Sequence, residues 1–376
     1  MIKLTKSYFK KIYKIIIFYF FYLAYSKPKN YKKSLKGYKE INVKIDKKNY
    51  KIFEFKKGRI YTNKNDITAY ITRDNHLTKA SLQFKKFDDI NSFNQSIKKN
   101  EVLNIGTPKL KKKIYGSVLS LLSGGAARDN FTHWFTDVIP RIFLYKKKFN
   151  IKKIDKLYIP SFKYRFQIET LHHLGFDKDK LISSEEHKHI EANKIYATSH
   201  PCSFEPEKLE KWSIDYLRSK FLIKNVKKIK KYEKIFIFRD QARLLNKNNL
   251  KKYVSHRILI NEIEIKDFLI SKGFHVIKPE EFSFKKQILI FSNAKYIVSL
   301  FGAAMMMLAF CKKNTKVLEI KPKKSGSEFL NISKKLKLQH KQIKIEPSYK
   351  SSIPQNGLIF CNLKLIKKNL NLLGLK

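Results

Sequence analysis

Apolar runs alternate with amphipathic helical stretches along the second half of the chain. Four short runs rich in Ile, Val, Phe and Leu predict buried strands at Lys234–Phe238, Phe274–Ile277, Tyr296–Leu300 and Val317–Ile320. Helices are predicted between these runs, and they begin at Asn261, Phe284 and Ala304. Strands that alternate with helices pair in parallel, so this half of the chain predicts a doubly wound α/β sheet.

The first half alternates in the same way but less regularly. Its predicted strands are Tyr50–Phe55, Arg59–Thr62, Ile67–Thr72, Tyr115–Leu122, Leu157–Pro160, Leu181–Ser184 and Lys194–Thr198, with a turn at Lys57–Gly58. Its predicted helices are Asn130–Arg141, Phe166–Leu174, which Gly175 ends, and Pro206–Phe221. Two α/β units in one chain suggest a cleft between them.

The chain therefore divides into four predicted parts. A basic and aromatic segment covers residues 1–30, one α/β domain covers 31–225, a second covers 226–350, and a terminal part with an amphipathic helix covers 351–376. At 376 residues the chain is long enough for two domains of ordinary size.

Lysines precede an aromatic apolar run at the N-terminus. Lys3, Lys6, Lys10, Lys11 and Lys14 come before Ile15–Tyr25, which is shorter than the roughly 20 residues that a spanning helix needs. The segment fits a helix on a membrane surface, a first core helix, or a signal-peptide core followed by a poor cleavage site. We expect a cytoplasmic protein, with a membrane-surface helix and a core helix as equal alternatives for this segment and a signal or anchor below both.

The charge of the chain is strongly positive and comes from lysine. The formal net charge is +50, whereas arginine occurs at only nine positions. Nucleic-acid readers rely on Arg for bidentate contacts, so we expect no nucleic-acid partner. A lysine surface attracts anionic lipid or anionic glycan instead. Three widely spaced cysteines, Cys202, Cys311 and Cys361, favour a reducing compartment over a disulfide framework or a zinc site.

The stretch Asn130–Arg141 carries the clearest candidate chemistry. His133, Asp137 and Arg141 are spaced four apart, so on one helix they share a face. The small-residue stretch Ser123–Ala127 precedes them and can bring backbone close to a ligand, while Pro140 is expected to strain the helix. A titratable pair beside a cation fits an acid–base site. It equally fits a buried helix whose His–Asp pair is structural.

Other candidate groups follow predicted strands. Ligands of open α/β sheets bind outside the carboxyl ends of the strands, where this chain has Arg239 and Arg243 after one strand and Gly302-Ala303 after another. The Gly302 loop opens a helix that can receive a phosphate, but from this loop alone a plain strand-to-helix turn is the better explanation. For the two arginines, bidentate phosphate binding and a solvated turn remain alternatives. No cluster has convincing metal-ligand spacing, so no metal site is predicted.

These residues resemble glycosyltransferase family 61. Asn130-x-x-His133-Trp134-x-x-Asp137-x-x-Pro140-Arg141 resembles the signature of that family, which includes capsular-polysaccharide biosynthesis proteins. Further similarities follow in order, at Arg239, Arg257-Ile-Leu-Ile-Asn261-Glu262, Gly273-Phe274, Phe282-Ser283-Phe284…Gln287, Phe301-Gly302-Ala303…Phe310 and Val317-Leu318-Glu319-Ile320. The similarity covers about residues 120–322, roughly half of the chain.

The resemblance implies an enzyme with a GT-B-like pair of Rossmann-type domains whose parallel sheets face a cleft. It implies an inverting hexosyl- or pentosyltransferase with a nucleotide-sugar donor, a glycan or lipid-linked glycan acceptor and no metal or other cofactor. The domain at 31–225 is then the acceptor side, and the domain at 226–350 binds the donor.

Each candidate site residue then has an implied role. The catalytic residues are His133 and Asp137, and the acceptor or cleft residues are Asn130, Trp134 and Arg141. The implied donor-binding residues are Arg239, Arg243, Arg257, Gly302, Ala303 and Glu319.

Two positions depart from the family pattern. Phe301 stands where the family usually has His, and Phe238 stands where it has Ser. Phe301 removes a polar group from the expected donor site. The alternative function is therefore a catalytically inactive protein that binds glycan or another anion on the same fold.

Overall fold

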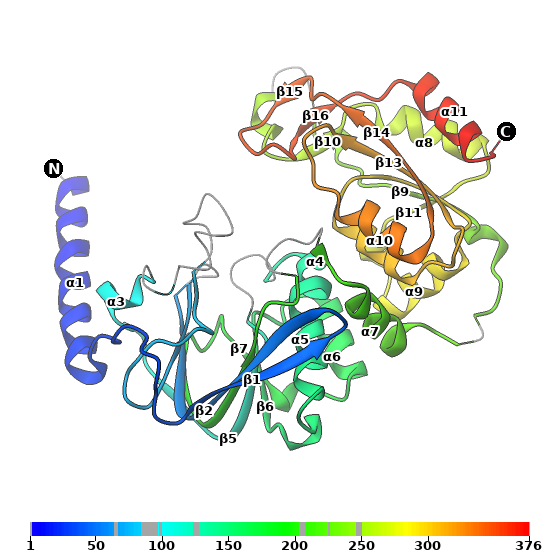
Figure 1. Ribbon diagram of the computed structural model, residues 1–376. Helices are drawn as coiled ribbons and strands as arrows, with labels where there is room; N and C mark the ends of the chain where they lie inside the picture. The colour runs from blue at the N-terminus through cyan, green and yellow to red at the C-terminus, as the bar shows by residue number, and fades with distance from the viewer. Residues whose placement is uncertain are drawn as a thin grey trace. The chain divides into compact units, whose positions relative to one another are not determined.

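The chain folds into two units, Met1–Phe204 and Glu205–Lys376, in a computed structural model (Figure 1). The structure describes residues 2–63, 67–83, 97, 100–122, 128–202, 208–224, 226–245 and 250–375. The division comes earlier than the boundary expected at residue 225. The reason is α7 (Lys211–Phe221), which packs against η10 (Ala303–Phe310), where Arg218 donates hydrogen bonds to two backbone carbonyls.

The first unit is built on a mixed sheet. Its elements are α1 (Ile2–Tyr25), β1 (Tyr38–Ile45), β2 (Lys48–Thr62), β3 (Ile67–Ile71), β4 (Leu82–Gln83), α3 (Val102–Ile105), β5 (Lys112–Ser120), α4 (Phe131–His133), η2 (Trp134–Val138), α5 (Ile139–Lys146), η3 (Ile151–Lys153), β6 (Lys156–Ile159), α6 (Arg165–His173), η4 (Lys178–Lys180), β7 (Leu181–Ser183) and β8 (His189–Thr198). Among the described residues the sheet has eight strands in the order β4-β3-β2-β8-β5-β6-β7, with β1 on β2.

Only part of this sheet is parallel. Strands β8, β5, β6 and β7 run parallel, whereas β1 to β4 add antiparallel pairs. The expected parallel sheet is confirmed for β5 to β8 and was wrong for β1 to β4, because short connections join β1, β2 and β3 as hairpins. The chain reverses its strand order between β5 and β8, which is where ligands of open α/β sheets bind.

The predicted turn at Lys57–Gly58 was also wrong. Strand β2 runs through it from Lys48 to Thr62, and Lys57 adopts a positive φ of 51° within the strand. Gly58 is required by close packing rather than by a turn. A Cβ atom there would lie 2.8 Å from Cβ of Phe55 and 3.2 Å from the Ile71 carbonyl oxygen.

The second unit has the predicted doubly wound sheet. Its elements are α7, η6 (Lys230–Tyr232), β9 (Lys234–Ile237), η7 (Ala242–Leu244), η8 (Leu250–Tyr253), β10 (Arg257–Leu259), α8 (Glu262–Ser271), β11 (His275–Ile277), η9 (Pro279–Glu281), α9 (Phe284–Asn293), β12 (Tyr296–Leu300), η10, β13 (Lys316–Pro322), α10 (Glu328–Leu336), β14 (Gln339–Ile345), β15 (Tyr349–Lys350), β16 (Gly357–Ile359) and α11 (Leu363–Leu372). The four predicted strands are confirmed, and η10 is a 3-10 helix.

All strands of the main sheet in this unit are parallel, in the order β11-β9-β12-β13-β14. Numbered by their appearance in this sheet, the order is 2-1-3-4-5, and the chain reverses direction between β9 and β12. Figure 1 shows α8 and α11 on one face and α9 and α10 on the other. Apolar residues of α8 and α11, among them Leu269 and Leu370, pack against Phe236, Val298 and Leu318 in the core.

His189 is a fully buried histidine in the first unit. Its Nδ1 donates to the Lys109 carbonyl oxygen at 3.0 Å, and its Nε2 lies 3.3 Å from Nη1 of Arg59 and can accept a hydrogen bond from it. Burial lowers the pKa of His189 to about 3. The folded protein therefore holds this imidazole neutral.

We predict that acid destabilises the first unit through His189. Its folded pKa lies below the unfolded value of about 6.5, so its contribution is complete above that pH and is lost as pH falls toward 3. The slope is at most about 1.4 kcal/mol per pH unit. Urea unfolding between about pH 7 and pH 5 should show a shallower pH dependence for His189→Gln than for wild type. The control is His172→Gln, at an exposed position, and equal slopes in all three proteins would contradict the prediction.

Candidate active site

The predicted helix at Asn130–Arg141 forms, but with a wide turn in its middle. Asn130 is its N-cap, because the side chain accepts hydrogen bonds from the backbone N–H groups of Thr132 and His133. The helix then widens into the π-helical segment η2, a feature often found at functional sites, and continues as α5. Pro140 does not end the helix, because it lies within the first positions of α5. The upstream stretch Ser123–Ala127 lies outside the described residues.

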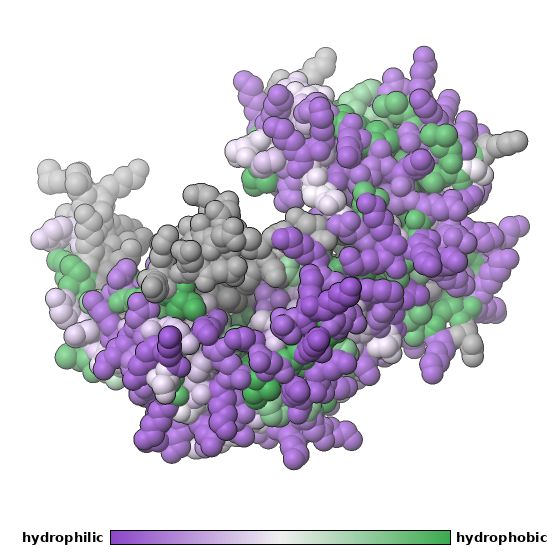
Figure 2. All heavy atoms as spheres, viewed as in Figure 1, coloured by the Kyte–Doolittle hydropathy of each residue, from purple (hydrophilic) through white to green (hydrophobic). Residues whose placement is uncertain are grey.

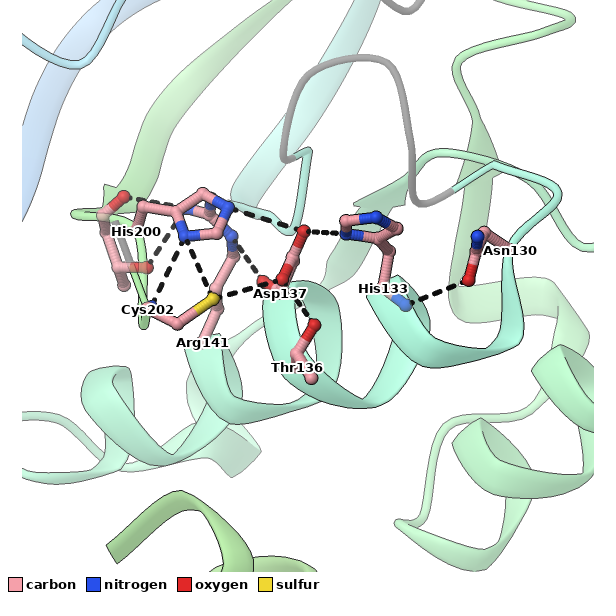
Figure 3. Close-up of polar contacts among 8 residues, drawn as sticks. Asn130, His133, Thr136, Asp137, Arg141, His200 and Cys202 are labelled. Atoms are coloured by element: carbon pink, nitrogen blue, oxygen red, sulfur yellow. Dashed lines mark hydrogen bonds and ion pairs between the residues drawn. The ribbon is translucent and has the colours of Figure 1, made fainter. Parts of the chain in front are cut away.

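His133 and Asp137 form the pair that the spacing predicted (Figure 3). Nδ1 of His133 lies 2.8 Å from Oδ2 of Asp137. The Asp137 side chain is 2% exposed and the His133 side chain 19%, so the carboxylate is buried behind the imidazole. Nδ1–H donates to the carboxylate, and the neutral ring then carries its lone pair on Nε2.

The other contacts of Asp137 hold it as an anion. Nε2 of His200 lies 3.5 Å from Oδ2, and Oδ1 accepts hydrogen bonds from Oγ1 of Thr136 at 2.5 Å and Sγ of Cys202 at 3.4 Å. Burial alone would raise the pKa of Asp137, but the histidines at positions 200 and 133 outweigh it and hold this pKa well below its usual range. Burial lowers the pKa of His200 to about 4, so His200 stays neutral.

This group lies where the strand order reverses. His133 and Asp137 follow β5, and His200 and Cys202 follow β8, its parallel neighbour. The carboxyl ends of both strands therefore deliver titratable groups to one position, which is the expected ligand site of such a sheet.

Arg141 and Trp134 support the group from the protein interior. Arg141 is almost fully buried and donates from Nε to the Asp137 carbonyl at 2.8 Å and from Nη1 to the Thr198 carbonyl at 2.7 Å. It thereby ties the helix to the end of β8. Trp134 is fully buried and donates from Nε1 to Oγ1 of Thr170 at 2.9 Å. The helical spacing predicts that Trp134 faces inward, whereas its bond to Thr170, the Arg141 contacts and the Asn130 cap were not predicted.

Asp137, His200 and Cys202 are also close enough together to be considered as metal ligands. Within the described part of the chain they form a His/Cys/Asp group whose ligand atoms lie within 4.8 Å of one another. Both Asp137 oxygens already accept hydrogen bonds, and the buried cation of Arg141 interacts electrostatically with Asp137 and Cys202. A divalent ion would have to displace those protons beside a fixed positive charge, so the donor set fits a metal poorly.

In the second unit, two arginines converge on Gly302. Arg239 follows β9, and its Nη1 donates to the Arg257 carbonyl oxygen at 3.2 Å. Nη1 of Arg257 donates to the Phe301 carbonyl oxygen at 2.5 Å. A Cβ atom added to Gly302 would lie 3.6 Å from Nη1 of Arg239 and 3.9 Å from Nη1 of Arg257, so glycine leaves both guanidinium groups accessible at the loop.

The two arginines form a cationic pair whose guanidinium groups make no direct contact with a carboxylate among the described residues. In the described ranges of the second unit, neither guanidinium group forms an ion pair with a carboxylate, because Glu262 accepts a hydrogen bond from the backbone N–H of Arg239 instead. Burial and the charge of Arg239 lower the pKa of Arg257 to about 10, which still leaves it charged at neutral pH. The pair lies at the reversal between β9 and β12, where a phosphate would supply the missing negative charge.

The Phe301 side chain is buried next to the Gly302 loop. Its ring is 2% exposed, with Cζ of Arg257 4.4 Å and Nζ of Lys321 4.9 Å from its centroid. A third neighbour is the ring of Phe329, whose centroid is 5.2 Å away. The substitution of Phe for the family's His therefore places a π surface beneath Arg257.

Of the other expected donor-binding residues, Glu319 and Arg243 contact other partners, whereas Ala303 is next to Gly302. Glu319 is fully buried, where it accepts a hydrogen bond from Nε2 of Gln342 and lies 3.2 Å from Nε2 of His340. Arg243 is exposed and pairs with Asp240 at 2.8 Å. Ala303 begins η10 directly after Gly302. The structure thus brings Arg239, Arg257 and Gly302 together, and it directs Glu319 and Arg243 to other partners.

Most of these residues lie within a stretch that matches a known protein family. The sequence model described as Glycosyltransferase 61 matches residues 131–318, half of the chain. The chain belongs to glycosyltransferase family 61. The match contains His133, Asp137, His200, Arg239 and Gly302, and it ends before Glu319. A comparison with curated proteins finds no match.

Membership in glycosyltransferase family 61 makes the protein a transferase of sugars. Two residues of the site were missed by the sequence reasoning. His200 and Cys202 both contact Asp137, yet neither was a candidate site residue. A signal was present, since both follow the carboxyl end of the predicted strand Lys194–Thr198.

Arg141 provides a stability test of this glycosyltransferase site. Arg141→Met keeps much of the side-chain volume but leaves the buried carbonyl oxygens of Asp137 and Thr198 without their donor. We expect a loss of about 1–3 kcal/mol for each orphaned acceptor, measured by urea unfolding. Arg165→Met, at an exposed arginine that pairs with Glu169, is the control and should change stability little. Equal stability of Arg141→Met and wild type would show that Arg141 is not a structural clamp.

Proposed function

We propose that this protein is an inverting glycosyltransferase that moves a hexosyl or pentosyl group from a nucleotide-sugar donor to a glycan acceptor, free or lipid-linked. Capsular or other surface polysaccharide biosynthesis is the role that suits this activity. The observation that carries the proposal is the convergence of Arg239 and Arg257 on Gly302 at the reversal point of the second sheet. A diphosphate is the ligand whose charge and fork-shaped geometry match two guanidinium groups.

Arg239 and Arg257 would act on the leaving group. As the bond between the anomeric carbon and the diphosphate breaks, negative charge builds up on the phosphate oxygens. Two half-buried cations with no ion-paired carboxylate in the described part of the unit stabilise that charge without having to reorganise. The backbone N–H groups at the start of η10, next to Gly302, can add to this stabilisation.

His133 and Asp137 would act on the acceptor. The acceptor hydroxyl oxygen attacks the anomeric carbon, and its proton passes to Nε2 of His133 as the new glycosidic bond forms. Asp137 favours the required tautomer, because its carboxylate accepts from Nδ1–H at 2.8 Å. It also stabilises the imidazolium that results. The bond to the diphosphate breaks on the opposite side of the sugar, which inverts the configuration.

The same proposal includes the arrangement and the cofactors of the enzyme. We propose a GT-B-like arrangement in which the His133 group and the Arg239 group act on one substrate complex. The support is that each unit carries its group at the reversal point of its own sheet. We also propose that no metal is required, because two guanidinium groups can neutralise the diphosphate and the Asp137 group fits a metal poorly.

The rival function is a catalytically inactive glycan- or anion-binding protein. It was motivated by Phe301, but the ring is buried beneath Arg257 and does not remove a polar group from a ligand surface. The retained His133–Asp137 pair favours the enzyme.

We further propose that α1 holds the enzyme at an anionic membrane surface. Within the described part of α1 the large apolar side chains are mostly exposed, among them Phe9, Ile16 and Phe20. No helix in the described part of the chain is long and apolar enough to cross a membrane. Exposed apolar side chains among lysines suit an interfacial helix.

The first functional prediction concerns the base. His133→Ala should lower kcat about 100-fold or more, the usual size of a general-base effect, with little change in KM for the donor. Asp137→Asn should act in the same direction, because the neutral amide no longer fixes the tautomer. Steady-state kinetics with and without EDTA provide the measurement, and His172→Ala, at an exposed histidine, is the control. Near-wild-type turnover in both site variants would remove the pair from the mechanism.

The second functional prediction concerns the donor. Arg239→Lys keeps the charge but loses the guanidinium fork. Calorimetry should therefore show that the affinity for a nucleoside diphosphate falls roughly tenfold or more. Arg243→Lys is the matched control, because Arg243 lies after the same strand but pairs with Asp240. Affinities that are unchanged in both Arg239→Lys and Arg239→Ala would reject the role of Arg239.

A further inference from the structure

A basic cavity lies at the foot of α1 in the first unit, and nothing in the proposed reaction uses it. Its volume is about 260 Å³, and it is formed by the last turn of α1, by β2, by the residues after β3, and by Lys111 and Glu191. Four cationic side chains, Lys57, Arg59, Arg73 and Lys111, line it against the single carboxylate of Glu191. That carboxylate is already bonded to Lys111, so the cavity carries an excess of positive charge.

Arg59 makes this cavity more than a patch of surface lysines. The residue is buried, and its hydrogen-bond partners in the described part of the chain are neutral groups. They include Oγ1 of Thr107 at 3.0 Å, Nε2 of His189 at 3.3 Å and the side-chain oxygen of Asn75. Burial lowers the pKa of Arg59 to about 10, so it remains charged at neutral pH. A buried cation bonded to neutral groups is stabilised by an anion in the space that it lines.

The cavity adjoins the exposed apolar surface of α1. Tyr25, in the last turn, lines the cavity and lies against Arg59 and Lys111, with its ring centroid 5.9 Å from Cζ of Arg59 and 5.3 Å from Nζ of Lys111. Two residues earlier, Leu23 is 82% exposed, and Phe20 is exposed one turn before it. Figure 2 shows hydrophobic side chains at the surface of this helix.

The cavity is distinct from the candidate active site. Arg59 pairs with Glu191 in the sheet, whereas His200 follows Thr198 at the other end of β8. Seven residues of extended strand separate Glu191 from Thr198, which is roughly 23 Å. A phosphate bound in this cavity is therefore too far from His133 and Asp137 to be the leaving group of the proposed reaction.

We propose that this cavity binds the phosphate of an anionic lipid headgroup while the apolar face of α1 lies in the acyl-chain boundary of the bilayer. The proposal rests on the membrane-surface role of α1 proposed above and adds a headgroup site to it. Phosphate and apolar chain are adjacent in a phospholipid, just as the cationic cavity and Leu23 are adjacent in the protein. Arg73 supplies a guanidinium group that suits phosphate oxygens, and Lys57 adds a further charge. Arg59 contributes its positive charge from the cavity wall, because both of its Nη atoms already donate to neutral groups.

The test uses flotation of the full-length protein with phosphatidylcholine vesicles that contain phosphatidylglycerol, oleate at matched surface charge, or neither. The variant is Lys57→Gln with Arg73→Gln, since both side chains line the cavity and both residues are exposed, so folding should survive. The control is Lys152→Gln with Lys153→Gln, which removes the same charge from exposed positions elsewhere in the unit. A third protein, Phe20→Ser with Leu23→Ser, tests the apolar face alone.

Wild type should prefer phosphatidylglycerol over oleate vesicles, and the cavity variant should lose roughly tenfold in affinity for the former while the control changes little. Equal losses in the cavity variant and the control, or no preference over oleate, would overturn the headgroup site. If Phe20→Ser with Leu23→Ser abolishes binding while the cavity variant binds normally, α1 keeps its membrane role and the cavity has none. Calorimetry with glycerol phosphate tests for a soluble phosphate ligand. Tight binding of glycerol phosphate, without a preference for phosphatidylglycerol over oleate vesicles, would also overturn the lipid assignment.

Discussion

The buried negative charge of Asp137 is the constraint on which the first unit's site depends. A carboxylate 2% exposed is costly unless its oxygens accept hydrogen bonds, and four side chains surround it here, from Thr136, His133, Cys202 and His200. Those partners come from the helix after β5 and from the residues after β8, so satisfying one charge joins the ends of two neighbouring strands. Arg141 completes the connection by bonding the Asp137 backbone to that of Thr198. The outer imidazole is then held in one tautomer, which is what acid–base chemistry requires.

In the second unit the charges gathered at the site are positive. There the charges are the half-buried cations Arg239 and Arg257, which repel each other and bond to backbone carbonyls rather than carboxylates in the described ranges. Phe301 lies beneath Arg257, so the position where the family usually has His contributes a π surface that supports the cation. A site that keeps two positive charges without an ion-paired carboxylate favours an anionic ligand and is stabilised when one binds. In the proposed reaction one unit supplies the base and the other the phosphate site, and transfer of a sugar from a nucleotide needs both.

The sequence was informative where the physics is local. The His133–Asp137 pair follows from i,i+4 spacing, and Arg239 and Gly302 follow from the rule that ligands bind at strand ends. The strands of the second sheet followed from apolar runs, but β14 was missed because its sequence, Gln-His-Lys-Gln-Ile-Lys-Ile, is mostly polar. Contacts between distant segments were not predictable. Cys202 lies 65 residues after Asp137, and only the pairing of β5 with β8 brings them together. The hydrogen bond between Trp134 and Thr170 and the burial of Phe301 depend in the same way on tertiary neighbours that no local pattern reveals.

The central claim is that a base group and a phosphate site serve one transfer reaction, and donor turnover tests it most directly. The full-length protein would be incubated with a panel of nucleotide sugars, each with and without glycan acceptors, and the products followed by mass spectrometry. The account predicts that at least one donor is converted to nucleoside diphosphate together with a glycan heavier by one sugar. It also predicts that the new linkage has the configuration opposite to that of the donor. Donors that all remain intact, although a nucleoside diphosphate binds to the folded protein, would contradict the account and leave an anion-binding protein in its place.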